Sequence, residues 1–210
     1  MRIVVFGYST TYGCWDYEHE GWVNRLRRFL DKKISSRVYN LGISGDTTIE
    51  LLERFERECK PRIKEGLEEL SVIIIAIGIN DSQFLNDKKI NRVPEEEFEL
   101  NIRKLIEISK NFKSKTLFVG LTPVDESKTM PVPWDKNKSY KNEYIHKYDG
   151  IIKSLCKENK IPFVEVFEKM LNLNYEKLLE DGLHPNSKGH MFIFEAVKDF
   201  LIDNEIINVD

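Results

Sequence analysis

Four short polar blocks of the sequence each contain a residue type that acyl transfer requires. The blocks are GYSTTYG at 7–13, NLGISGDTT at 40–48, GIND at 78–81 and DGLHPNSKGH at 181–190. They contribute a serine hydroxyl, a glycine-rich turn, a side-chain amide, and an acid followed by an imidazole. If the fold brings the blocks together, they provide a nucleophile, a base and donors for a developing oxyanion.

The last block places a carboxylate within reach of an imidazole. Asp181 precedes His184 by three residues across a Gly-Leu turn. A serine hydroxyl is a weak nucleophile and needs an adjacent base. Histidine suits that role because its pKa lies near neutral pH, and a carboxylate on its other nitrogen fixes the tautomer. We therefore expect Ser9 to be the nucleophile, His184 the base and Asp181 the residue that orients the base.

The middle blocks contain candidate donors for an oxyanion. A tetrahedral intermediate of acyl transfer is stabilised by preorganised N–H groups. We expect these to be the backbone N–H groups of Ser9 and Gly45 and the side-chain amide of Asn80. Glycine at 45 also lets the backbone approach a substrate closely. Asp81 and Gly42 are expected to have structural roles.

Short apolar runs alternate with helical patterns along the chain. The runs predict strands at 2–6, 37–41, 71–77, 116–121 and 161–166. The run SVIIIAI at 71–77 is rich in β-branched residues without alternation, which is typical of a parallel strand buried on both faces. Apolar residues at helical spacing predict helices at 21–32, 47–58, 61–70, 95–110, 139–158 and 187–201.

Strands that alternate with helices predict an α/β fold, a three-layer α/β/α sandwich with a five-stranded parallel sheet. We expect a single domain over 1–210. Ligands bind beyond the carboxyl ends of the strands in such sheets, which is where the four blocks should meet. The stretch at 122–139 contains three prolines and is long for a connection, so we expect a functional or mobile loop.

The four blocks together resemble the SGNH hydrolases, also called GDSL esterases and lipases. The residues that carry the resemblance are Ser9, Gly45, Asn80 and His184, in the family's order and over most of the chain. The resemblance implies a flavodoxin-like fold. It also implies hydrolysis of a small-molecule ester or thioester through an acyl-serine intermediate, with no cofactor and no metal. Asp181 and His184 would complete a triad with Ser9.

The first block departs from the family pattern. The family usually has Gly-Asp-Ser there, and this chain has Gly7, Tyr8 and Ser9. The usual carboxylate accepts hydrogen bonds that shape the nucleophile loop. We therefore expect this loop to be held differently or the activity to be weakened.

The bulk composition excludes several function classes. The formal net charge of −3 argues against a general nucleic-acid or membrane-surface binder, and no apolar run is long enough to span a membrane. The basic cluster of Arg25, Arg27 and Arg28 is interpreted as a solvated helix face. Three widely spaced cysteines and no visible signal peptide favour free thiols in a cytoplasmic protein. The oligomeric state stays open.

Other histidines compete with His184 for the role of base. His146 lies among lysines and should be solvated, His190 should be a packing or surface residue, and His19 could touch substrate. The acidic loop that contains Asp16 is too closely spaced for a common metal site, and we interpret it as solvated.

Two alternative functions and the choice of substrate remain open. Ser9 and its neighbouring threonines could cradle the phosphate of a flavin or nucleotide, as flavodoxin-like proteins do. An impaired member that binds an acyl ligand is the other alternative. The aromatic residues Tyr12, Trp15, Trp134 and Tyr140 could line the substrate pocket or simply pack. The sequence does not select among esters, and it favours short acyl chains only weakly.

Overall fold

A five-stranded parallel sheet forms the centre of the structure, a computed structural model that describes residues 1–63 and 69–208. The strands are β1 (Arg2–Gly7), β2 (Arg37–Gly42), β3 (Ser71–Ala76), β6 (Lys115–Val119) and β8 (Phe163–Val164). Their order across the sheet is β2-β1-β3-β6-β8, and every neighbouring pair is parallel. The predicted α/β/α sandwich is therefore confirmed.

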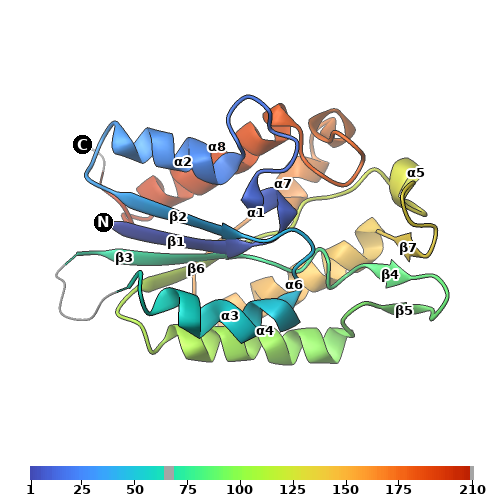
Figure 1. Ribbon diagram of the computed structural model, residues 1–210, viewed down its shortest axis with the longest axis horizontal. Helices are drawn as coiled ribbons and strands as arrows, with labels where there is room; N and C mark the ends of the chain where they lie inside the picture. Colours follow the sequence, from blue (N-terminus) through green and yellow to red (C-terminus); the bar gives the residue numbers. More distant parts are fainter. Residues whose placement is uncertain (64–68, 209–210) are drawn as a thin grey trace.

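Helices cover both faces of this sheet (Figure 1). One face is covered by α2 (Trp22–Asp31) and α8 (Ser187–Asp203). The other face is covered by α3 (Thr48–Cys59), α4 (Glu95–Ser109) and α6 (Asn142–Asn159). These five helices match five of the six predicted ones to within a few residues.

The central strands are apolar on both faces because each face has its own core. Ile73 and Ile75 of β3 join the cluster beneath α3, α4 and α6, whereas Val72 and Ile74 join the cluster beneath α2 and α8. All four side chains are fully buried. A continuous β-branched run is the pattern that a strand between two cores requires.

Two long connections at the carboxyl side of the sheet pair with each other. Strands β4 (Phe84–Leu85), β5 (Ile90–Asn91) and β7 (Lys138–Ser139) form a separate antiparallel sheet, in the order β5-β4-β7. Asn86 fastens the two connections, because its Nδ2 donates to the Lys136 carbonyl (2.9 Å) and its Oδ1 accepts from Ser139 Oγ (3.1 Å). The stretch at 122–139 is therefore an ordered part of the fold.

Short helices complete the chain, and the sequence patterns did not predict them. They are α1 (Ser9–Tyr12), α5 (Glu126–Thr129), α7 (Phe167–Leu171) and the 3-10 helix η1 (Tyr175–Leu178). The predicted helix at 61–70 lies largely outside the described residues, and its first residues form a turn. The predicted helix at 139–158 begins later, at Asn142, because β7 occupies Lys138–Ser139.

The interpretation of two charged residues near the N-terminus was wrong. Arg25 does not lie on a solvated face: its buried guanidinium contacts the buried carboxylate of Asp16, with Nε to Oδ2 at 3.0 Å. Asp16 also accepts from the Gly21 N–H (3.1 Å), so the loop before α2 folds back over the start of that helix. Arg27 and Arg28 are exposed, as expected.

Candidate active site

The four polar blocks meet at one cavity beyond the carboxyl ends of the strands. The cavity has a volume of about 550 Å³ and is lined by Ser9, Gly45, Asn80 and His184, among others. Ser9 follows β1, Gly45 follows β2, Asn80 follows β3, and His184 precedes α8. The fold therefore places these four predicted residues together.

Backbone contacts fix the position of Ser9. The strand β1 ends at Gly7, and Ser9 begins α1, so the chain turns sharply between them. A Cβ at position 7 would lie 2.0 Å from Thr11 Oγ1 and 2.5 Å from the Ala76 carbonyl, which only glycine avoids. The Gly7 carbonyl accepts from the Ile43 N–H at 3.0 Å. Since Ser9 is the first residue of α1, its N–H has no acceptor within the helix and remains available.

Tyr8 occupies the position where the resembled family usually has aspartate. Its side chain is 4% exposed and belongs to the apolar cluster beneath α3, α4 and α6. Burial raises the pKa of its phenol to about 12, and the neighbouring hydroxyls of Thr10 and Thr122 oppose that shift only partly. Position 8 is thus a neutral core position here. The turn is held instead through the Gly7 carbonyl and by Asn40, which donates to the Thr11 carbonyl (2.8 Å).

His184 lies between Ser9 and Asp181. Its Nε2 is 3.0 Å from Ser9 Oγ, and its Nδ1 is 2.7 Å from Asp181 Oδ2. A carboxylate only accepts hydrogen bonds, so the proton lies on Nδ1 and the lone pair of Nε2 faces the serine hydroxyl. This tautomer is the one that can take a proton from Ser9.

The turn at 181–184 is built around the carboxylate of Asp181. Its Oδ1 accepts from the N–H groups of Leu183 (2.9 Å) and His184 (2.8 Å). Burial acts to raise the pKa of Asp181, but the hydrogen bonds from the His184 side chain and these N–H groups outweigh it and lower the pKa. Gly182 between them has φ +91°, and a Cβ there would lie 2.7 Å from Lys128 Cβ. The carboxylate is thus held charged beside the imidazole.

Gly45 and Asn80 lie in the loops after β2 and β3. Gly45 has φ +88°, a conformation that favours glycine, and its carbonyl accepts from Arg92 Nη1 at 3.0 Å. Asn80 Nδ2 donates to the Asp46 carbonyl at 2.9 Å, which ties the two loops together. Asn80 is therefore fastened to the loop that contains Gly45, and Gly45 is held by Arg92, which follows β5.

Asp81 has the structural role expected for it. Its Oδ1 accepts from the N–H (2.9 Å) and the hydroxyl (2.5 Å) of Thr48, the first residue of α3. Burial raises the pKa of Asp81 to about 6. Gly42 is structural too, because a Cβ there would lie 2.2 Å from the Tyr12 nitrogen.

The wall of the cavity includes residues that the sequence patterns did not single out. Trp15, Trp134 and Tyr140 line it, as considered from the sequence. The further lining residues are Cys14, Ser44, Gln83, Arg92, Lys138 and Leu183. Gln83, Arg92, Lys138 and Tyr140 all come from the antiparallel sheet or the residues beside it. A weak signal existed for Gln83, which follows GIND by two residues.

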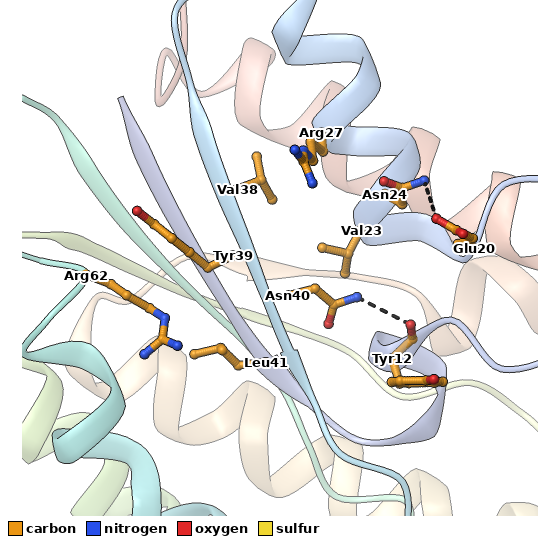
Figure 2. Close-up of a pocket in the computed structure, with 10 residues that line it drawn as sticks. All are labelled: Tyr12, Glu20, Val23, Asn24, Arg27, Val38, Tyr39, Asn40, Leu41 and Arg62. Atoms are coloured by element: carbon orange, nitrogen blue, oxygen red, sulfur yellow. Dashed lines mark hydrogen bonds between the residues drawn. The ribbon is translucent and has the colours of Figure 1, made fainter.

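Tyr12 lines a different hollow, at the outer edge of β2 (Figure 2). This hollow has a volume of about 540 Å³, and Figure 2 shows Val23 and Arg27 on one side of the strand and Tyr39 and Arg62 on the other. One N–H group of this edge strand already has a partner, because Asn40 Oδ1 accepts from the Gly42 N–H at 3.0 Å. Tyr12 therefore does not contribute to the cavity that contains Ser9.

The other histidines are engaged elsewhere. His190 is fully buried; its Nδ1 accepts from the Trp22 N–H (3.3 Å), and its Nε2 donates to the Cys14 carbonyl (2.8 Å). Burial lowers the pKa of His190, which keeps it neutral. His19 contacts Arg28 and does not line the cavity, and His146 is exposed beside Glu168, as expected.

Two features are absent from the part of the chain that the structure describes. Within residues 1–63 and 69–208, no group of three or more histidine, cysteine, aspartate or glutamate side chains is arranged to hold a metal ion. No helix in the same ranges is both long enough and apolar enough to cross a membrane.

Comparisons with known proteins point to one kind of chemistry. Residues 5–192 match the model of the GDSL-like lipase/acylhydrolase family. An isoamyl acetate-hydrolyzing esterase of Saccharomyces cerevisiae is 28% identical over 186 residues, which are 83% of this chain and 70% of the relative. A GDSL esterase/lipase of Arabidopsis thaliana is 25% identical over 205 residues, 93% of this chain and 83% of the relative.

The fold has close counterparts among solved structures. A variant of Axe2, an acetyl xylan esterase from Geobacillus stearothermophilus, superposes with a TM-score of 0.73 at 21% identity. The match covers 95% of this chain and 94% of that one. The likeness at this identity concerns the fold.

Proposed function

Because the chain belongs to the GDSL-like lipase/acylhydrolase family, we propose that it cleaves a carboxylic ester through an acyl-serine intermediate. Membership makes the chain a carboxylic ester hydrolase, and the proposal concerns the residues, the mechanism and the substrate. The observation that carries it is the line of contacts from Ser9 Oγ through His184 to Asp181, at 3.0 and 2.7 Å.

In the proposed acylation step, Ser9 Oγ attacks the carbonyl carbon of the ester. His184 Nε2 takes the hydroxyl proton as the bond forms, and Asp181 stabilises the resulting imidazolium. The negative charge that develops on the carbonyl oxygen is stabilised by the N–H groups of Ser9 and Gly45 and by the amide of Asn80. His184 then gives the proton to the leaving alcohol.

Deacylation repeats the same steps with water as the nucleophile. His184 takes a proton from the water, which attacks the acyl-serine, and returns it to Ser9 Oγ as the carboxylic acid leaves. The nucleophile, the base and the proposed oxyanion donors line the one cavity, and Asp181 is hydrogen-bonded to the base, so no cofactor is required for the proposed mechanism.

We propose a small ester with a short acyl chain as the substrate. The yeast relative is named for the hydrolysis of isoamyl acetate, which has an acetyl group. The cavity here is mixed in character, with Arg92, Lys138 and Gln83 beside the indoles of Trp15 and Trp134. Such a wall suits a small, partly polar ester better than a long hydrocarbon chain.

The alternatives receive less support. A phosphate would have to replace the contact between Ser9 and His184 and would lie near the carboxylate of Asp181, which repels anions. The contacts of the triad are formed in spite of Tyr8, so the residue that suggested an impaired member leaves the geometry intact. We therefore favour an active esterase.

Hydrolysis of p-nitrophenyl acetate tests the proposal. Ser9→Ala and His184→Ala should each lose three or more orders of magnitude in kcat, the loss that removal of a triad member causes. Ser154→Ala and His146→Ala are matched controls at exposed positions of α6 and should retain full activity. Activity that survives Ser9→Ala would overturn the mechanism.

A chain-length series tests the substrate class. We expect the acetate ester to be hydrolysed faster than p-nitrophenyl octanoate, and isoamyl acetate to release acetate. A preference for the octanoate would contradict the short-chain assignment while leaving the mechanism in place.

A further inference from the structure

Three buried side chains form a chain of hydrogen bonds that ends beside the cavity. Gln83 Nε2 lies 2.5 Å from the hydroxyl of Tyr140, and that hydroxyl lies 3.1 Å from Asn80 Oδ1. Asn80 Nδ2 in turn lies 2.9 Å from the Asp46 carbonyl. The side chains are between 4 and 6% exposed, so water does not compete freely for these contacts.

The direction of each hydrogen bond follows from the Asp46 carbonyl, the acceptor at the end of the set. The Asp46 carbonyl can only accept, so the atom of Asn80 that faces it is the nitrogen. The oxygen of the Asn80 amide therefore faces Tyr140, whose hydroxyl must donate to it. Since that hydroxyl has only one proton, it accepts from Gln83, and the Gln83 nitrogen is the donor. The set has one consistent arrangement of protons.

This arrangement leaves one proton of the Asn80 amide free. One N–H of Nδ2 is used by the Asp46 carbonyl, and an amide nitrogen has two. Asn80 lines the cavity together with Ser9, so the second N–H is the group that can donate to an acyl oxygen. If the amide were turned over, its oxygen would face the cavity and would repel the oxyanion.

We propose that Tyr140 and Gln83 are positioning residues, which hold the Asn80 amide with its nitrogen toward the acyl oxygen of the substrate. The inference rests on the proposed esterase mechanism, in which Asn80 is a donor to the oxyanion. It adds two residues that neither touch the reacting atoms nor belong to the four polar blocks.

The backbone around both positioning residues is fixed. The N–H of Tyr140 donates to the Thr129 carbonyl, and the Thr129 hydroxyl donates to the Tyr140 carbonyl, both at 2.9 Å. The carbonyl of Gln83 accepts from the Arg92 N–H at 2.7 Å. The two connections that form the antiparallel sheet therefore bring the Tyr140 hydroxyl to Asn80 and the Gln83 amide to that hydroxyl. Burial raises the pKa of Tyr140, so its hydroxyl stays protonated and keeps its role as a donor.

The decisive experiment is a double-mutant cycle measured with p-nitrophenyl acetate. Tyr140→Phe removes one oxygen and leaves the buried ring in place. We expect kcat to fall about tenfold with KM changed less than twofold, because loss of a whole oxyanion donor costs about 10²–10³ and here only its orientation is lost. In an Asn80→Ala background, the same substitution should have no further effect on kcat, because the amide it positions is gone.

A second variant and a matched control keep the outcome interpretable. Gln83→Met should lower kcat several-fold. Without the Gln83 donor, the direction in which the Tyr140 hydroxyl points its proton is no longer fixed. Tyr148→Phe is the control: Tyr148 is also fully buried, and its hydroxyl donates to the Val93 carbonyl outside the cavity. It should lower the midpoint of thermal unfolding and leave kcat within twofold of the wild type.

Each result has a definite reading. A tenfold fall in kcat with Tyr140→Phe that persists in the Asn80→Ala background would overturn the inference, because Tyr140 would then act by another route. Unchanged kcat in Tyr140→Phe would overturn it as well. If Ser9→Ala remains active, the esterase mechanism fails first, which distinguishes the two failures.

Discussion

Asp181 uses its two oxygens for two separate tasks. Oδ1 accepts the N–H groups of Leu183 and His184 and so shapes the turn, whereas Oδ2 accepts from the imidazole. Because one carboxylate does both, the turn and the tautomer of His184 are set by the same residue. A substitution that keeps Oδ1 and alters Oδ2 can separate the two effects.

Asp181→Asn is that substitution. Its oxygen can still accept the backbone N–H groups, but its nitrogen next to Nδ1 favours the wrong tautomer of His184. We expect kcat to fall by about 10³–10⁴, with the unfolding midpoint little changed. The measurements are steady-state hydrolysis of p-nitrophenyl acetate and thermal unfolding, with Asp199→Asn on the exposed face of α8 as the control. Near-normal kcat would show that Oδ2 does not orient the base.

The site residues that could be predicted are those placed by a short spacing or by the end of a strand. Asp181 and His184 are three residues apart, so spacing alone predicted their contact. Ser9, Gly45 and Asn80 could be brought together because parallel strands end at one edge. The contact between Gln83 and Tyr140 joins residues from two separate connections, and no pattern along the chain encodes it. The pairing of Arg25 with Asp16 was missed for another reason. In the sequence each residue stands among other charged residues, and such a cluster is typical of a solvated surface.

At the scale of elements, the antiparallel sheet of β4, β5 and β7 is the part that shapes the cavity wall. Trp134 lies between α5 and β7, and Arg92 follows β5, so both depend on how the two connections pair. Each of these strands has only two residues, so backbone pairing between them is short. The side chain of Asn86 adds two hydrogen bonds to the backbone hydrogen bond from its own N–H to the Asn137 carbonyl (2.8 Å). Asn86 therefore strengthens the contact between the two connections that form the wall.

Asn86→Ala should loosen this wall without unfolding the chain. It removes two hydrogen bonds, each contributing about 1 kcal/mol, so local opening becomes more frequent. We expect kcat/KM for p-nitrophenyl acetate to fall about three- to tenfold, and amide hydrogen exchange to quicken at residues 130–140. Asn204→Ala, which removes a side-chain contact at the far end of α8, is the control. Unchanged exchange at 130–140 would contradict the assigned role of Asn86.

The elements that the sequence predicted are those with an apolar run or a long periodic pattern. The apolar runs of β1 and β3 and the helical spacing of α3 and α4 are such signals, and tertiary packing does not override them. The two-residue strands β4, β5 and β7 carry neither signal. The chain at 122–139 was therefore predicted only as irregular. Its strand β7 is defined by pairing with β4, which belongs to a distant part of the sequence.

At the scale of the whole molecule, one buried acid links stability to pH. Asp149 is 3% exposed, and its Oδ1 accepts from the Leu121 N–H at 2.7 Å. Burial raises its pKa to about 7, whereas the pKa of aspartate in an unfolded chain is about 3.9. Between these two values the folded chain holds a proton that the unfolded chain has lost. The contribution of Asp149 to stability therefore declines as pH rises through this range.

Asp149→Asn should remove that dependence, because the amide keeps its oxygen for Leu121 and never ionises. We expect the variant to gain stability relative to the wild type as pH rises from 4 to 7, by at most about 1.4 kcal/mol per pH unit. Urea unfolding at several pH values measures it, with Asp199→Asn as the control. Parallel stability curves for Asp149→Asn and the wild type would contradict the assignment.

The edge of the main sheet has a consequence for neighbouring molecules. A free edge strand presents a row of peptide groups on which another chain can add a strand. At the carboxyl end of β2, however, the Asn40 side chain already occupies the outward N–H of Gly42. An incoming strand would find this donor already used, so its pairing with β2 would lack one hydrogen bond at the end nearest Ser9. The chain thus disfavours, through one of its own side chains, the addition of a second copy's strand at that end of the sheet.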